Sequence, residues 1–334
     1  MKKLQDILYG VSIESIVGST AIPIKDIEFD SRKIKKENLF IAQKGVVLDG
    51  HDFIFNAIEQ GAVAIVCEKL PKKCVMGIVY VIVASASEAL GHIATNFYDN
   101  PSKNLKLIGV TGTNGKTTVA SLLFELFTSI GYPCGLISTV KISYQNSEWD
   151  NSHTTPDALS LNKHLSKMII SGISHCFMEL SSHGIAQRRA NGLYFNGGVF
   201  TNLTHDHLDY HGDFKSYRDT KKLFFDQLPK TAFALTNIDD KNGTFMFQNC
   251  IASKHTYAIK QYADFKAQIL ECEFSGMLLK IQGEEVWTNL VGEFNIQNLL
   301  AVYAVAVILG ESSLEILKKM SALKPIRGLS LIHI

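Results

Sequence analysis

Short apolar runs alternate with amphipathic stretches along the whole chain. In the first hundred residues, strand-like runs at 39–42, 62–67 and 78–83 are separated by helical patterns around 53–60 and 86–97. Runs of four to six apolar residues are typical of buried strands, and apolar positions three to four residues apart are typical of helices. The pattern therefore predicts a first α/β unit over residues 1–100.

A turn-rich joint, YDNPS at 98–102, separates this unit from a second one. Strands that alternate with helices predict a mostly parallel sheet with helices on both faces. We therefore predict an α/β fold in which a small N-terminal domain at 1–100 precedes a larger domain at 101–328. The strands expected in the larger domain are 106–110, 135–139, 175–180, 198–203 and 231–237.

One glycine-rich segment, GVTGTNGKTT at 109–118, lies between a predicted strand and the helical pattern at 119–127. Such a turn lets backbone N–H groups converge on phosphate oxygens at a helix N-terminus. Lys116 would add a positive charge, and the Thr117 hydroxyl suits a magnesium ion. The general P-loop pattern has glycine where this chain has Val110, so the segment is a GTNGKT variant. The alternative is a glycine-rich turn with a solvent-facing lysine.

Ligands of parallel sheets gather beyond the carboxyl ends of the strands, so the residues that follow each strand are candidates for a binding site. Glu179 ends a predicted strand, where a carboxylate can hold magnesium or cap a helix. The stretch THDHLDYHG at 204–212 follows another strand and carries three histidines. A zinc site lacks a clear pair of partner ligands. The spacing favours an oxygen-rich magnesium site with one histidine.

Three further stretches leave their roles open. The helix expected at 217–226 contains two adjacent lysines, which are typical of a solvated face. The polar turn HTTPD at 153–157 would contact a substrate or cap the helix that begins at Pro156. Asn295 would cap the apolar helix at 299–309 or contact a base.

The amino-acid composition does not alter the predicted fold or site. The net charge of +1 gives no indication of a nucleic-acid or membrane surface. Six cysteines without CxxC spacing suit a reducing cytoplasm, and the N-terminus lacks the apolar core of a signal peptide. The longest apolar run, 299–309, has too few residues to span a bilayer. We therefore expect a cytoplasmic protein without membrane insertion or nucleic-acid partners.

Taken together, these motifs resemble the Mur ligases of bacterial cell-wall synthesis, and the likeness extends over nearly the whole chain. It is similar within that family to the enzymes that add the third residue of the peptidoglycan stem peptide. The segments that carry the resemblance are FDSRKIKKENLFIA at 29–42, TGTNGKTT at 111–118, HTTPD at 153–157, MELSSHGIAQRR at 178–189, FTNLTHDHLDYHGDFKSYRDTKKLFF at 200–225 and GEFNIQN at 292–298.

The resemblance implies an ATP-dependent amide-bond ligase. In such enzymes ATP phosphorylates the glutamate carboxyl group of UDP-N-acetylmuramoyl-L-alanyl-D-glutamate. The amine of a diamino acid, L-lysine or meso-diaminopimelate, then attacks the acyl phosphate. Lysine and Mg²⁺ must neutralise the two anions that meet in this reaction.

The resemblance also implies roles for individual residues. Lys116, Glu179, His207 and Lys221 would be catalytic, and Lys221 would carry a carbamate formed from carbon dioxide or bicarbonate. Thr117, Glu179, His207 and the carbamate on Lys221 would hold Mg²⁺. ATP would contact Gly112, Thr113, Asn114, Gly115, Lys116, Thr117, Thr118 and Asn295. The UDP-linked substrate would contact Ser31, Thr154, Thr155, Ser181, Gln187 and Arg189.

Other functions remain open at this stage. Another Mur ligase step or a ligase similar to folylpolyglutamate synthetase would share the P-loop. The latter lacks a domain like 1–100, and DHLDYHG fits it less well. A P-loop nucleotide-binding module without ligase activity would leave HTTPD and SSHG without a role.

The residues at the end of the chain lead to a separate expectation, about a further domain. KPIRG at 324–328 is similar to the family's joint before a C-terminal, Rossmann-like domain, which we expect to be missing here. The residues after it, LSLIHI at 329–334, are similar to a translated sequencing-adapter sequence, and we expect them not to be native. Loss of that domain would leave the ATP and UDP-substrate sites in place and put ligase activity in doubt. The choice between L-lysine and meso-diaminopimelate stays open.

Overall fold

The computed structural model describes residues 1–45, 48–151, 153–206 and 208–324. These residues form two compact units, and the first of them is assembled from three separate parts of the chain. The polar joint predicted at 98–102 contains the main boundary, between Pro101 and Ser102. The first unit holds Met1–Pro101, Asp157–Lys167 and Gln187–Leu193, and the second holds Ser102–Pro156, Met168–Ala186 and the residues from Tyr194 onward.

The first unit is built on a five-stranded sheet with the strand order β2-β7-β6-β5-β4. Its strands β4 to β7 pair in parallel, and β2 pairs antiparallel with β7 at one edge. The strands are β2 (Ile13–Val17), β4 (Asp26–Glu28), β5 (Asn38–Ile41), β6 (Ala62–Cys67) and β7 (Val79–Val83), with a small pair of β1 (Lys2–Lys3) and β3 (Pro23–Ile24). Its helices include α1 (Leu4–Ile7), α2 (Ile54–Glu59) and α3 (Ala86–Phe97).

Both faces of this sheet are covered, which explains why its central strands β6 and β7 are apolar at every position. Leu39 and Val81 lie in one apolar cluster together with residues of α1 and α3. Phe40 and Tyr80, their neighbours in sequence, lie in a second cluster with residues of α2. Successive side chains of a strand point to opposite faces, so a strand buried on both faces contains no polar position.

The second unit is built on an eleven-stranded sheet with the order β11-β10-β9-β12-β8-β13-β14-β15-β16-β17-β18. The strands from β9 to β16 in this order pair in parallel, as predicted, whereas antiparallel strands extend the sheet at both ends. The strands are β8 (Lys106–Thr111), β9 (Cys134–Ile137), β10 (Lys141–Tyr144), β11 (Ser147–Asp150), β12 (His175–Glu179), β13 (Gly197–Phe200), β14 (Phe233–Asn237), β15 (Ser253–Ala258), β16 (Phe265–Glu273), β17 (Gly276–Ile281) and β18 (Glu284–Thr288).

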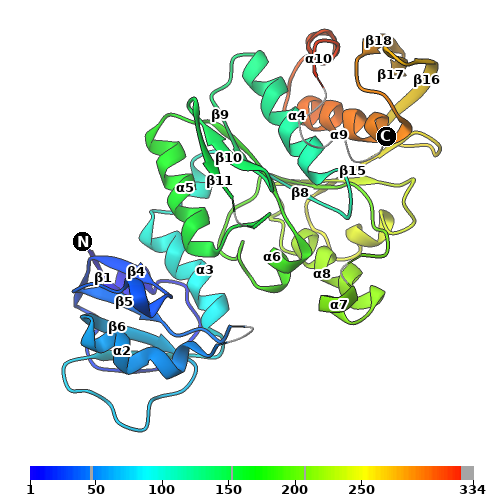
Figure 1. Cartoon of the computed structure of the whole chain (residues 1–334). Coiled ribbons are helices and arrows are strands. Elements are labelled where there is room, and N and C mark those ends of the chain that lie inside the picture. The colour runs from blue at the N-terminus through cyan, green and yellow to red at the C-terminus, as the bar shows by residue number, and fades with distance from the viewer. Residues whose placement is uncertain (46–47, 152, 207, 325–334) are drawn as a thin grey trace. The chain divides into compact units, whose positions relative to one another are not determined.

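Helices cover both faces of the parallel part of this sheet. Ile108 and Val110 of β8 pack into a large core with α4 (Lys116–Ser129) and α9 (Glu293–Ile308), which lie side by side in Figure 1. On the other face, α8 (Phe214–Asp226) approaches the strands closely. A Cβ atom on Gly109 of β8 would lie 2.7 Å from the ring of Phe224, so the absence of a side chain there lets α8 approach. The remaining helices are α5 (Ala158–Ile170), α6 (Ser182–Ala186), α7 (Leu208–His211) and α10 (Ser313–Met320).

The apolar run at 299–309 forms most of α9, whose residues Ile296 to Ala306 are almost all buried. Among the described residues, no helix has both the length and the apolar character needed to cross a membrane.

Candidate active site around the P-loop

The predicted P-loop lies between β8 and α4, and two of its glycines are required by close neighbours. Gly115 has φ +86°, in the left-handed region, and a Cβ atom there would overlap Oδ1 of Asn298. A Cβ atom on Gly112 would overlap Oγ1 of Thr201. Any other residue at these two positions would displace the loop. The loop therefore has the geometry that places backbone N–H groups at the start of a helix.

The loop is held by the residues that follow β13. The Thr113 backbone N–H donates to the Asn202 carbonyl oxygen at 2.8 Å, and the Asn114 N–H donates to Asn202 Oδ1 at 2.9 Å. The Thr201 hydroxyl donates to the Asn114 carbonyl oxygen at 2.6 Å. The Thr204 N–H donates to Thr113 Oγ1 at 3.0 Å. The predicted phosphate loop thus gets its shape from a segment nearly ninety residues later, with separations of 87 to 91 positions.

Lys116 folds back over the loop at the start of α4. Its Nζ donates to the carbonyl oxygens of Gly112 at 3.1 Å and Thr113 at 2.8 Å. Burial lowers the pKa of Lys116 from the ordinary lysine value, and the nearby carboxylates of Glu179 and Asp206 oppose that shift. The amine is therefore held at the P-loop by two of the loop's own carbonyl oxygens.

A second lysine, Lys221 of α8, reaches the same loop from the other side of the sheet. Its side chain is 1% exposed, and its Nζ donates to the Gly112 carbonyl oxygen at 2.9 Å. Burial lowers the pKa of Lys221 well below the ordinary lysine value, and the charge of Lys116 lowers it further. The Nζ also lies 4.7 Å from the ring centre of Tyr217, whose hydroxyl is 3.0 Å from Thr113 Oγ1.

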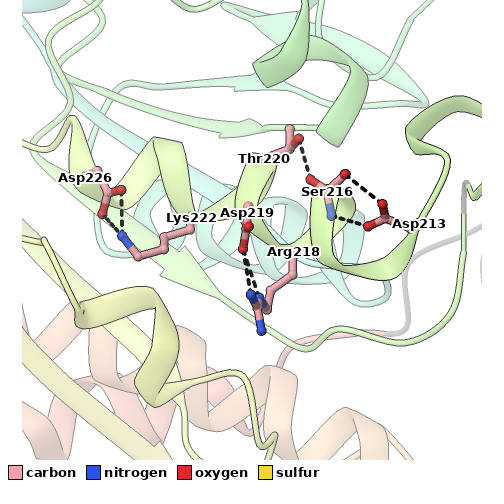
Figure 2. A network of polar contacts seen from close by, with 7 residues as sticks. All are labelled: Asp213, Ser216, Arg218, Asp219, Thr220, Lys222 and Asp226. Carbon is pink, nitrogen blue, oxygen red and sulfur yellow. Dashed lines mark hydrogen bonds and ion pairs between the residues drawn. The ribbon is translucent and has the colours of Figure 1, made fainter.

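Helix α8 has a network of polar contacts within itself and at its N-terminal cap, which Figure 2 shows. Asp213 caps the helix by accepting the Ser216 N–H at 2.7 Å, and the Thr220 hydroxyl donates to the Ser216 carbonyl oxygen at 2.8 Å. The second of the adjacent lysines, Lys222, forms an ion pair with Asp226 at 2.6 Å. The two neighbouring lysines thus have different environments: one reaches the P-loop and the other is paired within its own helix.

The carboxylate of Glu179 lies at the end of β12, the strand that pairs with β8. It is fully buried, and its Oε2 accepts hydrogen bonds from the hydroxyls of Thr117 at 2.9 Å and Thr139 at 3.1 Å. The Thr139 backbone N–H donates to Oε1 at 2.7 Å. Burial raises the pKa of Glu179, whereas the hydrogen bonds from Thr139 and Thr117 and the charge of Lys116 oppose this.

The polar turn predicted at 153–157 lies beside the strand end of Glu179. The buried Thr155 hydroxyl donates to the Glu179 carbonyl oxygen at 3.0 Å and accepts the Ser181 N–H at 2.9 Å. Ser181 in turn caps α6 by accepting the Gly184 N–H at 3.0 Å. The Thr154 hydroxyl oxygen lies 3.1 Å from that of Thr139. These contacts place Thr154, Thr155 and Ser181 next to the predicted metal-binding carboxylate.

The other three predicted substrate residues belong to the first unit. Ser31 is 7% exposed and begins a short 3-10 helix, Ser31–Lys33, which Asp30 caps. Arg189 donates from Nε and Nη2 to the Gln187 side-chain oxygen, at 3.0 and 2.7 Å. The planar end of the Arg189 side chain is thereby held by Gln187 in one orientation.

The predicted base contact, Asn295, is half-buried in the first turn of α9, where its Nδ2 donates to the Val291 carbonyl oxygen at 2.8 Å. One turn further along, Asn298 is 6% exposed and touches Gly115 of the P-loop. We did not single out Asn298 from the sequence, although it ends the motif GEFNIQN. The residues Thr139, Thr201 and Asn202 were missed as well, because their role depends on strand neighbours that no local pattern reveals.

The predicted histidine ligand, His207, lies outside the described residues. Within the ranges that the structure describes, no three side chains of His, Cys, Asp or Glu gather closely enough to hold a metal ion. The hydroxyl of Thr117 and the carboxylate of Glu179 nevertheless lie 2.9 Å apart, and both are oxygen ligands of the kind Mg²⁺ prefers. The residues present therefore fit a magnesium ion bound together with a nucleotide.

Comparison with known proteins agrees with this geometry. Residues 110–306 match the Mur ligase middle domain, and residues 23–98 match the catalytic domain of the Mur ligase family. Two relatives are named UDP-N-acetylmuramoyl-L-alanyl-D-glutamate--2,6-diaminopimelate ligase. The one from Cytophaga hutchinsonii is 49% identical, and the one from Phocaeicola vulgatus is 48% identical. Each alignment covers 98% of this chain and 67% of the relative.

A solved structure with the same name, UDP-N-acetylmuramoyl-L-alanyl-D-glutamate--2,6-diaminopimelate ligase, has the same fold. It is 26% identical, matches with a TM-score of 0.84, and the match covers 98% of this chain and 68% of that one. Mur ligases are ATP-dependent ligases, which agrees with the P-loop and its two lysines. The chain therefore belongs to the Mur ligase family.

Proposed function

We propose that this protein catalyses the ATP-dependent joining of 2,6-diaminopimelate to UDP-N-acetylmuramoyl-L-alanyl-D-glutamate in peptidoglycan precursor synthesis. The names of the relatives at 49% and 48% identity support both substrates. The observation that carries the proposal is the buried Lys221 amine, 2.9 Å from the P-loop carbonyl of Gly112. A simple nucleotide switch has no use for a second lysine buried at that position. A cytoplasmic location remains a prediction from the sequence.

In this proposal the P-loop binds the phosphates of ATP. The residues involved are Gly112 to Thr118, with the Lys116 amine at the phosphate oxygens and Asn295 at the base. The positive end of α4 and the loop N–H groups favour a polyanion there. Lys116 already lies over the loop, so a small rotation of its side chain is enough to meet a phosphate.

Thr117 and Glu179 would hold Mg²⁺, together with His207 and a carbamate on Lys221. When bound, the ion neutralises negative charge on the phosphate and on the attacking carboxylate. Glu179 is kept in one orientation by Thr139 and Thr117. Because burial raises its pKa, the Glu179 carboxylate gains from a cation placed beside it.

Lys221 would react with carbon dioxide through its neutral amine. The lowered pKa favours that neutral form, because burial and the charge of Lys116 both disfavour the ammonium group. Carbamate formation joins the nitrogen to the carbon of carbon dioxide and releases one proton from the amine. The product is a carboxylate that replaces an amine at the P-loop and faces the positively charged Lys116.

Ser31 would meet the uridine-diphosphate end of the UDP-linked substrate. Its sugar-peptide portion would contact Thr154, Thr155, Ser181, Gln187 and Arg189. The Arg189 guanidinium suits an anionic group of the substrate, and Gln187 already fixes its orientation. Positive charge from Lys116 would stabilise the phosphate as the acyl phosphate forms. The amine of the diamino acid would then attack the acyl carbon and displace phosphate.

The proposal is tested with the purified product of the complete gene, UDP-N-acetylmuramoyl-L-alanyl-D-glutamate, ATP, Mg²⁺ and bicarbonate. We expect ADP formation that requires the UDP-linked dipeptide and is faster with 2,6-diaminopimelate than with L-lysine. A preference for L-lysine would leave the ligase in place and overturn the choice of amino acid. No ADP with either amino acid would overturn the proposal as a whole.

A further inference from the structure

Two adjacent carboxylates, Asp239 and Asp240, lie just beyond β14, separated from it by Ile238, and belong to none of the predicted sites. Asp240 accepts the Leu203 backbone N–H on Oδ2 at 2.7 Å. Its other oxygen accepts the backbone N–H and the side-chain Nδ2 of Asn242, at 2.7 and 2.9 Å. Both oxygens of Asp240 therefore act as acceptors, and one of them reaches the segment that follows β13.

Asp239 reaches a different segment, the one that follows β15. Its Oδ2 accepts the Ile259 N–H at 2.6 Å, and its Oδ1 accepts the N–H groups of Lys260 and Gln261, each at 3.1 Å. Three consecutive backbone N–H groups thus converge on one carboxylate. Because a carboxylate accepts through both oxygens, it can order such a turn without any donor of its own.

The two segments lead to different parts of the nucleotide site. Leu203 precedes Thr204, whose N–H donates to Thr113 of the P-loop at 3.0 Å. It also lies three residues before Asp206, which acts electrostatically on both Lys116 and Lys221. Asp240 is therefore connected, through the segment after β13, to the part of the nucleotide site that is proposed to bind the phosphates.

Asp239 is connected, through the turn after β15, to the part of the nucleotide site that is proposed to bind the base. Lys260, whose N–H it accepts, forms an ion pair from its Nζ to Glu293 at 2.9 Å. Glu293 is the first residue of α9 and lies two positions before Asn295, the proposed base contact. The ion pair is exposed, so the ordered turn rather than its charge is expected to carry the effect.

We propose that Asp239 and Asp240 are positioning residues of the nucleotide site, Asp240 for its phosphate side and Asp239 for its base side. Neither touches the nucleotide; each orders the backbone of a segment whose neighbours do. This inference rests on the proposed function, because it uses the P-loop as the phosphate site and Asn295 as the base contact. It adds that two neighbours in sequence control separate properties of nucleotide binding.

The test uses Asp240→Asn and Asp239→Asn in the 334-residue chain. An amide has the size of the carboxylate but replaces one acceptor with a donor, so each variant loses a hydrogen bond without leaving a cavity. Asp49→Asn is the matched control, because Asp49 also accepts a backbone N–H, that of His51 at 3.0 Å, but belongs to the first unit and lies on neither segment. The probe is a fluorescent ADP analogue, with ATP and GTP as competitors, measured with and without Mg²⁺.

We expect Asp240→Asn to reduce the gain in affinity that Mg²⁺ provides by about tenfold, the size of one lost charge-assisted hydrogen bond, while the preference for ATP over GTP is kept. Asp239→Asn should do the reverse, reducing the preference for ATP and keeping the effect of Mg²⁺. Asp240→Glu should restore part of the Mg²⁺ effect, since it keeps both acceptors.

A merely structural role would give a different result. If all three Asn variants lower the melting temperature alike and leave the two binding properties unchanged or equally reduced, the inference is wrong. If the wild-type chain itself binds no ADP analogue, the proposed function fails at the P-loop, and the inference fails with it. The wild-type measurement thus separates the two failures.

Discussion

Lys116 and Lys221 donate hydrogen bonds to the same atom, the carbonyl oxygen of Gly112, at 3.1 and 2.9 Å. Two amines that share one acceptor in a buried place cannot both carry a full charge without cost. Lys221 is the more buried, and the charge of Lys116 lowers its pKa further. The lowered pKa of Lys221 favours its neutral amine, which is the form that would react with carbon dioxide in the proposed function.

Carbamate formation on Lys221 can be detected without any turnover. In buffer that contains ¹³C-labelled bicarbonate, we expect a protein-bound ¹³C carbamate signal in the NMR spectrum of the wild-type chain. Lys221→Ala should abolish it, because the reactive amine is removed. Lys222→Ala is the matched control: it removes an adjacent lysine that is paired with Asp226 and should leave the signal unchanged. A signal that survives Lys221→Ala would show that another amine reacts.

The burial of Lys221 should also appear as a pH dependence of stability. Its pKa is lowered in the folded chain, so the unfolded chain binds the proton more strongly and folding releases it. The stability contributed by this group therefore rises with pH, over the window between its lowered pKa and the ordinary value of about 10.4.

We expect Lys221→Met to melt at a higher temperature than wild type at about pH 7, with the difference shrinking towards about pH 10. The measurement is thermal unfolding of both proteins in buffer free of carbon dioxide, so that the amine stays unmodified. A difference that grows with pH would mean that the Lys221 amine is stabilised as an ammonium group.

A methyl group at Gly115 should disrupt nucleotide binding. Gly115→Ala places a Cβ atom on Asn298 Oδ1, in a backbone conformation that alanine rarely adopts, so the loop must move. We expect affinity for ADP to fall by at least about tenfold, roughly 1.4 kcal/mol, in a calorimetric titration.

Gly131→Ala is the control for that prediction. Gly131 has a positive φ of 100° as well, but a Cβ atom there meets nothing within 4 Å. It should cost stability by about 1 kcal/mol and leave ADP binding unchanged. Equal losses of affinity in both variants would point to general destabilisation rather than to the shape of the P-loop.

Arg189 should be needed for the UDP-linked substrate as a guanidinium and not merely as a charge. Arg189→Lys keeps the charge but loses the paired donors that Gln187 orients, so we expect about tenfold weaker binding of UDP-N-acetylmuramoyl-L-alanyl-D-glutamate. Arg188→Lys makes the same change one residue earlier and should bind normally. Calorimetric titration with this substrate in the absence of ATP measures both, and equal affinity of Arg189→Lys and wild type would remove Arg189 from the site.

Much of the fold could be predicted from local patterns. The strand predicted at 62–67 and the helix predicted at 86–97 agree with β6 and α3 to the residue. In both, the apolar pattern stops at the same positions as the residues that typically begin or end an element. The strand at 198–203 was predicted too long, since β13 ends at Phe200 and the next residues turn to hold the P-loop. The antiparallel strands β17 and β18 were not predicted, because their exposed positions interrupt the apolar runs.

The residues expected to carry the chemistry have sequence signals that the residues supporting them lack. The sequence around Lys116 follows a motif, and the place of Glu179 at the end of a predicted strand indicates a metal ligand. The resemblance to Mur ligases implies a role for Lys221. Asn202 and Thr139 carry no such signal: each acts because a neighbouring strand ends at the same edge of the sheet. No local sequence pattern predicts that residues 157–167 and 187–193 belong to the first unit. Their place depends on the packing of α5 and of the segment after α6.

The P-loop receives its partners from strands that come much later in the chain: Thr117 meets Glu179 62 residues on, and Asn114 meets Thr201 87 residues on. A nascent chain that has been synthesised only as far as the end of α4 thus contains the P-loop motif but not the later residues that hold it. Long-range strand pairing closes large loops and is slow, so the site is completed late in folding. Bound nucleotide should therefore slow unfolding and leave the folding rate nearly unchanged. The reason is that it binds a site whose contacts have not yet formed in the folding transition state.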